Sequence, residues 1–156
     1  MSDREDYRTS MIALFREAFE GIPEGQNYTW FVQGKQGIFD AIESTASEDA
    51  SKRPTPDCNS IGSHLNHLRY ALWLANAETR GEAPQSDWEG SWSKQAFDPE
   101  EWRQLGVGLR REYEGVLNWM ESKPDLSDSE TMTGAFAQIA HAAYHLGSIR
   151  QLMKVV

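Results

Sequence analysis

Cysteine is almost absent from this sequence, since Cys58 is the only one among 156 residues. A lone cysteine cannot close an intramolecular disulfide, and no charged segment followed by an apolar one opens the chain. Disulfides and such leaders are typical of oxidising compartments and of secretion, so we expect the protein in the reducing cytoplasm. We interpret Cys58 as a small packed apolar residue rather than a reactive thiol.

Long apolar runs and excess positive charge are also missing. No stretch approaches the roughly 20 apolar residues of a membrane-spanning helix, and the most apolar segment, near 134–149, contains two histidines. Lys and Arg number 15 against 24 Asp and Glu, which gives a net charge of −9. Such a surface repels phosphate backbones and anionic lipid, so we expect a soluble protein with neither nucleic acid nor membrane as a partner.

Runs that alternate apolar and polar residues over the length of a strand are lacking, and no segment repeats. Apolar residues instead recur at helical spacing, which predicts an all-α protein with helices at 5–20, 29–44, 60–79, 99–122 and 130–154. The fold class that we expect is a four-helix bundle over residues 29–154, with residues 1–21 as an additional N-terminal helix. Residues 1–156 then form a single domain.

The ends of the predicted helices carry capping signals of unequal strength. Asp98, followed by a proline and two glutamates, predicts the start of the fourth helix, and Asn59 or Ser60 is expected to cap the third. The second helix is the weakest, because Gly34 and Gly37 lie in its middle. Its inward residues are expected to be Trp30, Phe31, Ile38, Phe39 and Ile42.

The four histidines fall on two of these helices, His64 and His67 on the third and His141 and His145 on the last. Residues four apart on a helix lie about 40° apart around the axis and about 6 Å apart along it, so two imidazoles converge on one cation. Two protonated imidazoles held so close and half buried would repel, whereas two neutral ones share a metal. A third ligand is expected from His64 or His67, and helical phase does not choose between them.

The alternative interpretation is that these are partly exposed histidines bonded to carboxylates or water. The second histidine pair favours the metal site. Three neutral imidazoles suit zinc or nickel first. Iron, cobalt and manganese stay as alternatives, because the affinity order of the metals alone does not identify the ion. A fourth position left open would bind a water nucleophile or a substrate thiolate.

Two segments resemble the DinB-like (DinB/YfiT) metal-binding four-helix bundles. Residues 60–68, SIGSHLNHL, are similar to the start of that family's second bundle helix, and residues 140–151, AHAAYHLGSIRQ, to its closing H-x-x-x-H-x-G-x-I helix. The resemblance implies that His67, His141 and His145 are the metal ligands. His64 would then contact a ligand or be particular to a subfamily, without binding the metal itself.

The same resemblance implies a homodimer and, in some members, thiol S-transfer with a low-molecular-weight thiol. We therefore expect a divalent-metal-binding protein, either a metal-dependent thiol transferase or hydrolase acting on a small molecule, or a non-catalytic, metal-stabilised bundle with a binding or stress-response role. A shared fold does not determine which.

Residues 80–97 have no sustained period and are expected to form a long ordered loop. Its Trp88 and Trp92 are interpreted either as a lid over the metal pocket or as a plug at the bundle end. Arg150 is expected to meet a carboxylate, a dimer interface or an anionic substrate. Glu78 lies about three helical turns from His67, which disfavours a direct role in catalysis.

Overall fold

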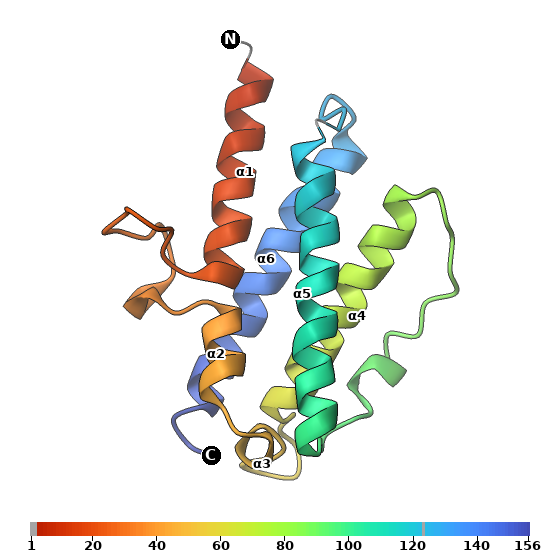
Figure 1. Cartoon of the computed structure of the whole chain (residues 1–156). Helices are drawn as coiled ribbons and strands as arrows, with labels where there is room; N and C mark the ends of the chain where they lie inside the picture. Colours follow the sequence, from red (N-terminus) through yellow and green to blue (C-terminus); the bar gives the residue numbers. More distant parts are fainter. Residues whose placement is uncertain (1–2, 123) are drawn as a thin grey trace.

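The computed structural model describes residues 3–122 and 124–156, and every regular element in this part of the chain is helical (Figure 1). This confirms the all-α fold class. The long helices are α1 (Asp3–Glu20), α4 (Ile61–Thr79), α5 (Pro99–Glu121) and α6 (Ser129–Leu152). The short elements are α2 (Ile38–Ser44), α3 (Ser47–Ala50) and the 3-10 turns η1 (Gln33–Lys35) and η2 (Gly90–Trp92). None of the described helices combines the length and apolar character needed to cross a bilayer.

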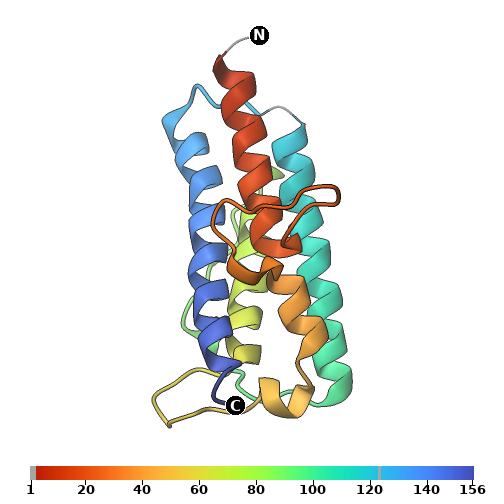
Figure 2. The same ribbon diagram turned by 90° about the vertical axis from the view of Figure 1, so that its left-hand side faces the viewer.

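The long helices pack side by side around one core (Figures 1 and 2). Helix α4 contacts α5 and α6, and α1 contacts the same two helices from the other side. The short helix α2 follows α1 below its C-terminal end in both views, so that these two helices share one side of the molecule. The sequence predicts that residues 29–44 form a helix of the bundle and that residues 1–21 are an addition to it. In the structure α1 and α2 together occupy one side of the core.

The predicted helix over residues 29–44 is wrong in its first half, because α2 covers only the second half. Glu17 of α1, which is 2% exposed, accepts hydrogen bonds from the backbone N–H groups of Trp30, Phe31 and Val32 at 2.8, 2.7 and 2.9 Å. Three successive amides bound by one carboxylate hold this segment as a loop against α1. Trp30 and Phe31, expected to point inward, are therefore 69% and 39% exposed.

Glycine determines where α2 begins. A Cβ atom at Gly37 would lie 2.5 Å from the carbonyl oxygen of Phe19 and from the nitrogen of Gly21, so the chain returns onto the end of α1 at a point where only glycine fits. Gly34 has a φ of 72°, in the left-handed region that favours glycine. Asp40 then accepts a hydrogen bond from the Gly37 N–H at 2.8 Å and caps α2.

The starts of the three later long helices follow the sequence closely. Ser60, Asp98 and Asp128 each accept a hydrogen bond from the backbone N–H three residues further on, at 3.1, 2.8 and 2.7 Å. Ser60, rather than the preceding asparagine, is the cap of α4. Helix α6 ends at Leu152, close to the predicted limit of residue 154.

An aromatic cluster joins α1, α2 and α5 in the core. Phe15, Phe19 and Phe39 surround Tyr113 with ring centroids 5.3, 4.8 and 5.2 Å from its own. The Tyr113 hydroxyl hydrogen-bonds the Glu20 carboxylate at the edge of the cluster. This packing fixes α1 and α5, against which α4 and α6 are positioned.

The loop between α4 and α5 is ordered, as predicted, and lies along α4. Three polar side chains of α4 donate hydrogen bonds to loop carbonyls: Ser60 to Gln95 at 2.6 Å, Ser63 to Trp92 at 3.1 Å, and Asn66 to Ser91 at 3.0 Å. These contacts attach η2 to the same face of α4 that carries the histidines.

We predict that Glu17→Ala lowers the free energy of unfolding by about 3 kcal/mol, because three buried or partly buried backbone donors lose a charged acceptor. Urea denaturation measures this change. The matched control is Glu24→Ala, which removes an exposed glutamate from the following loop and is expected to change stability by less than about 0.5 kcal/mol. Equal stabilities of the two variants would contradict the role assigned to Glu17.

Candidate metal centre

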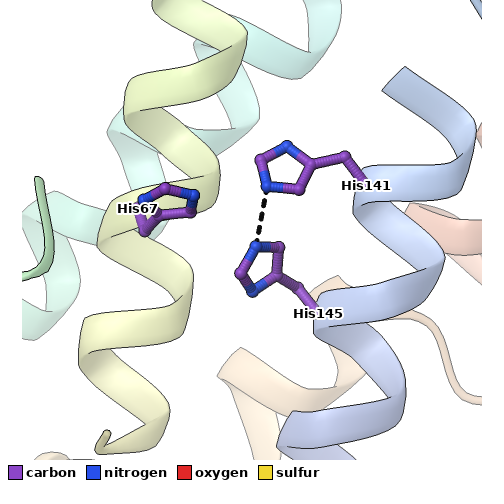
Figure 3. Close-up of side chains that lie close together, drawn as sticks. All are labelled: His67, His141 and His145. Atoms are coloured by element: carbon purple, nitrogen blue, oxygen red, sulfur yellow. Dashed lines mark hydrogen bonds between the residues drawn. The ribbon is translucent and has the colours of Figure 1, made fainter. Parts of the chain in front are cut away.

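Helices α4 and α6 bring three histidines to one point. One ring nitrogen from each of His67, His141 and His145 lies within 4.8 Å of the others, and Figure 3 shows the three imidazoles facing one another across the gap between the helices. His67 is 7% exposed, His145 is 1% exposed and His141 is half-buried. The structure thus brings together the three residues that the resemblance implies as metal ligands.

The two histidines of α6 are already in contact. Nε2 of His141 lies 2.8 Å from Nε2 of His145, as the dashed line in Figure 3 marks. A tetrahedral ion with bonds of about 2.0–2.1 Å holds its ligand nitrogens about 3.3 Å apart. Small side-chain rotations therefore separate this pair and draw in the third ring, so the residues present fit a metal ion of the zinc class.

The proton on His67 can be placed from its neighbours. Its Nδ1 lies 2.7 Å from the hydroxyl oxygen of Ser91, and that hydroxyl donates its single proton to the carbonyl of Trp88 at 2.6 Å. Ser91 must therefore accept, and His67 carries its proton on Nδ1. The lone pair of His67 is left on Nε2, where a metal ion needs it.

Trp92 holds the ring of His67 from the other side. The two rings are stacked, with centroids 4.0 Å apart and planes 18° apart. Trp88 lies further out, 5.7 Å from His67 by ring centroid, and is 48% exposed. Trp92 is therefore a wall of the histidine cluster, and Trp88 lies at its outer edge.

His64 lies on the far side of His145 from the other two. Its Nδ1 is 3.0 Å from Nδ1 of His145, whose Nε2 faces His141. His64 thus contacts the nitrogen of His145 that points away from the cluster, and this geometry favours His67 as the third ligand. When Nε2 of His145 offers its lone pair to an ion, its Nδ1 carries a proton that His64 is placed to accept.

The four imidazoles are kept neutral by their surroundings. Burial lowers the pKa of His64 and of His141 below the ordinary value of 6.5. Burial, with the neighbouring imidazoles adding to it, lowers the pKa of His67 to about 4 and that of His145 to about 2. In the described part of the chain no carboxylate hydrogen-bonds to any of these rings. At neutral pH the cluster therefore presents lone pairs rather than charges.

The other residues singled out in the sequence lie away from the cluster. Arg150 lies beside the Gly34 turn, where its guanidinium would be 3.2 Å from a Cβ added to that glycine. Glu78 lines a groove near the C-terminal end of α4. Cys58 is half-buried before α4, and the hydroxyl of Thr55 bonds its sulfur at 3.2 Å.

Ser91 is the residue at this site that the sequence does not predict. It belongs to a loop without helical period, so no spacing rule places its hydroxyl beside a histidine ring. The pair of tryptophans that flank it is the only signal in the sequence, and it indicates that this loop packs against the protein.

Comparison of the chain with family models, curated proteins and solved structures finds no match. The resemblance to the DinB-like bundles therefore stays an expectation, and the function is inferred from the geometry of the histidine cluster.

We predict that Ser91→Ala weakens zinc binding about 10- to 100-fold, because His67 loses the acceptor that fixes its tautomer. Competition with a chromogenic chelator measures the affinity. Ser93→Ala is the matched control, since the hydroxyl of Ser93 bonds the carbonyl of Gly90 in the same loop, no other bond of it is found in the described part of the chain, and the residue is exposed. Equal affinities of both variants and the unmodified protein would refute this role of Ser91.

We also predict that the metal-free protein loses stability as the pH falls from about 6.5 toward 4. In this range the histidines of the unfolded chain bind protons that the folded chain excludes, so the free energy of unfolding decreases with acid. Urea denaturation at pH 7.5, 6.5 and 5.5 measures the slope. His145→Gln is expected to flatten it, and an unchanged slope in this variant would contradict the assignment.

Proposed function

We propose that the protein binds one divalent metal ion through Nε2 of His67, His141 and His145 and uses it as an enzyme acting on a small molecule. The observation that supports this most strongly is the set of three neutral, converging imidazoles, two of which have their second nitrogen bound by a neighbour. Zinc or nickel is the proposed ion, with iron, cobalt or manganese as alternatives.

Catalysis is favoured by the number of ligands. Among the described residues no cysteine, carboxylate or fourth histidine joins the group, so a tetrahedral ion keeps one position for water or substrate. A metal ion held in this way supplies either a bound water with a pKa near ~7 or a site for a substrate thiolate. The proposed reaction is thus transfer to or from a low-molecular-weight thiol, or hydrolysis.

The protein's own residues hold the ligands in place. Ser91 accepts the Nδ1 proton of His67, Trp92 stacks on the same ring, and His64 is placed to accept the Nδ1 proton of His145. Because His67 and His145 are nearly fully buried, the half-buried His141 marks the side from which a substrate approaches.

The DinB-like bundle and its homodimer belong to this proposal. Support for the bundle comes from the long helices packed around a core and from a histidine cluster on α4 and α6. Support for a dimer comes from Phe136 and Tyr144 on α6, which are 46% and 69% exposed.

The second candidate function is a non-catalytic bundle in which the ion joins α4 to α6. It is favoured by the low exposure of His67 and His145, which restricts access to the cluster. In that case the metal raises thermal stability and its coordination shell is closed.

We predict that alanine at His67, His141 or His145 abolishes stoichiometric metal binding, whereas His64→Ala leaves it intact with an affinity about 10- to 100-fold lower. Isothermal titration with zinc, followed by metal analysis of the dialysed protein, measures both quantities. Retained metal in His67→Ala, or equal losses at His64 and His67, would overturn the ligand set. The visible spectrum of the cobalt-substituted protein separates the two candidate functions: a change on adding a small thiol favours the enzyme, and no change favours the closed structural site.

A further inference from the structure

A groove of about 490 Å³ lies at the end of the molecule where the chain passes from α5 to α6. It is formed by the C-terminal parts of α4 and α5 and the N-terminal part of α6. Figure 1 shows these parts of the three helices toward the top of the view. Its volume is in the range of pockets that hold small organic molecules. No residue of the histidine cluster lines it.

The groove, like the histidine cluster, is lined by residues of both α4 and α6. Gln138, at its edge, precedes His141 by three residues, and Ala75 follows His67 by eight. At about 1.5 Å of rise per residue, Gln138 is about 4.5 Å from His141 along α6 and Ala75 is about 12 Å from His67 along α4. A molecule in the groove that reaches past Gln138 therefore approaches His141, the more accessible of the three proposed ligands.

The walls of the groove combine an apolar surface with negative charge. Val116 and Trp119 of α5 supply the apolar part, while Glu78 of α4 and Glu130 of α6 add carboxylates. Among the described residues that line it there is no lysine or arginine. The C-terminal ends of α4 and α5, which carry partial negative charge, are directed to the same region.

Gln138 supplies an independent sign of a ligand. Its side-chain oxygen is buried and, among the described residues, has no hydrogen-bond partner. A buried acceptor without a donor costs about 1–3 kcal/mol, so a rotation of this side chain that turns the oxygen toward the groove would let a ligand donate a proton to it and remove this cost. A positively charged donor group would also be attracted by the carboxylates that line the groove.

We propose that this groove binds a small organic cation, an ammonium group on an apolar body, and directs it toward the metal centre. In this proposal the carboxylates of the groove attract the ammonium group, Gln138 turns its oxygen toward it, and the apolar body lies against Trp119 and Val116. This inference rests on the proposed function, whose substrate class it specifies.

Two glycines of α6 provide a matched pair of variants. A Cβ added at Gly134 or at Gly147 meets no atom within 4 Å, so a larger side chain fits at either position. Gly134 lines the groove, whereas Gly147 is exposed on the same helix and does not. Gly134→Leu therefore fills the groove, and Gly147→Leu repeats the substitution away from it with the same gain in helix propensity.

The test uses 2-phenylethylamine, which is protonated at neutral pH, with 2-phenylethanol and 3-phenylpropanoate as its neutral and anionic counterparts. Calorimetry or protein NMR on the zinc-loaded protein measures binding. We expect a Kd of about 1 mM or tighter for the amine and at least tenfold weaker binding of the other two. Gly134→Leu should weaken amine binding at least tenfold and Gly147→Leu less than twofold. Gln138→Leu, which removes the acceptor, should weaken it at least fivefold.

Cobalt-loaded protein tests whether the groove leads to the metal. The proton signals of the bound amine should broaden strongly with cobalt compared with zinc, because the paramagnetic ion relaxes nearby protons. Equal binding of the three compounds, tighter binding of the anion, undiminished binding to Gly134→Leu, or unbroadened signals would each overturn the inference.

Failure of this inference is distinguishable from failure of the proposed function. Metal titration of the same variants should give unchanged zinc affinity for Gly134→Leu, since this substitution is two turns from His141. Zinc binding without selective amine binding refutes the groove and leaves the metal centre. Absence of zinc binding to the unmodified protein refutes the proposed function, and with it the approach of the amine to the metal.

Discussion

Helices α4 and α6 hold four imidazoles together, two of them nearly fully buried, and among the described residues no carboxylate bonds them. Protonation of such rings is opposed by burial and by their mutual repulsion, so the pKa of His145 falls to about 2 and that of His67 to about 4. Neutral rings with convergent lone pairs need either shared protons or a metal ion. The proposed function follows from this constraint.

For metal binding, the orientation of each imidazole ring is as important as its neutral charge state. An imidazole ligates through one nitrogen, and the partner of the other nitrogen determines which one is free. In this protein the loop that carries η2 supplies the partner for His67 through Ser91, and α4 supplies the partner for His145 through His64. The hydrogen bonds that attach the loop to α4 therefore serve the histidine cluster as well as the fold.

Helix α1 packs against α5 and α6 and so supports the helix that carries His141 and His145. Glu17 fixes residues 30–32, and Gly37 brings the chain back onto the end of α1, so that α1 and α2 together close the core around Tyr113. Helix α4 packs against both α5 and α6. The histidine cluster and the acidic groove both lie between α4 and α6, at different positions along these helices. No proposed ligand lines the groove, and Gln138, which does, precedes His141 by three residues on α6.

The sequence by itself determined the all-α class, the capping of α5 by Asp98 and the position of the α4 cap to within two residues, because helical spacing and capping are local properties of the chain. It also gave the extent of the ordered loop. It did not determine the break in residues 29–44, since Glu17 and Gly37 act through contacts with α1 that no local pattern encodes. The geometry that favours the proposed ligand His67 over His64, the contact of Ser91 with His67 and the groove lined by Gln138 are visible only in the tertiary structure, because each depends on which atoms of separate helices and loops meet in space.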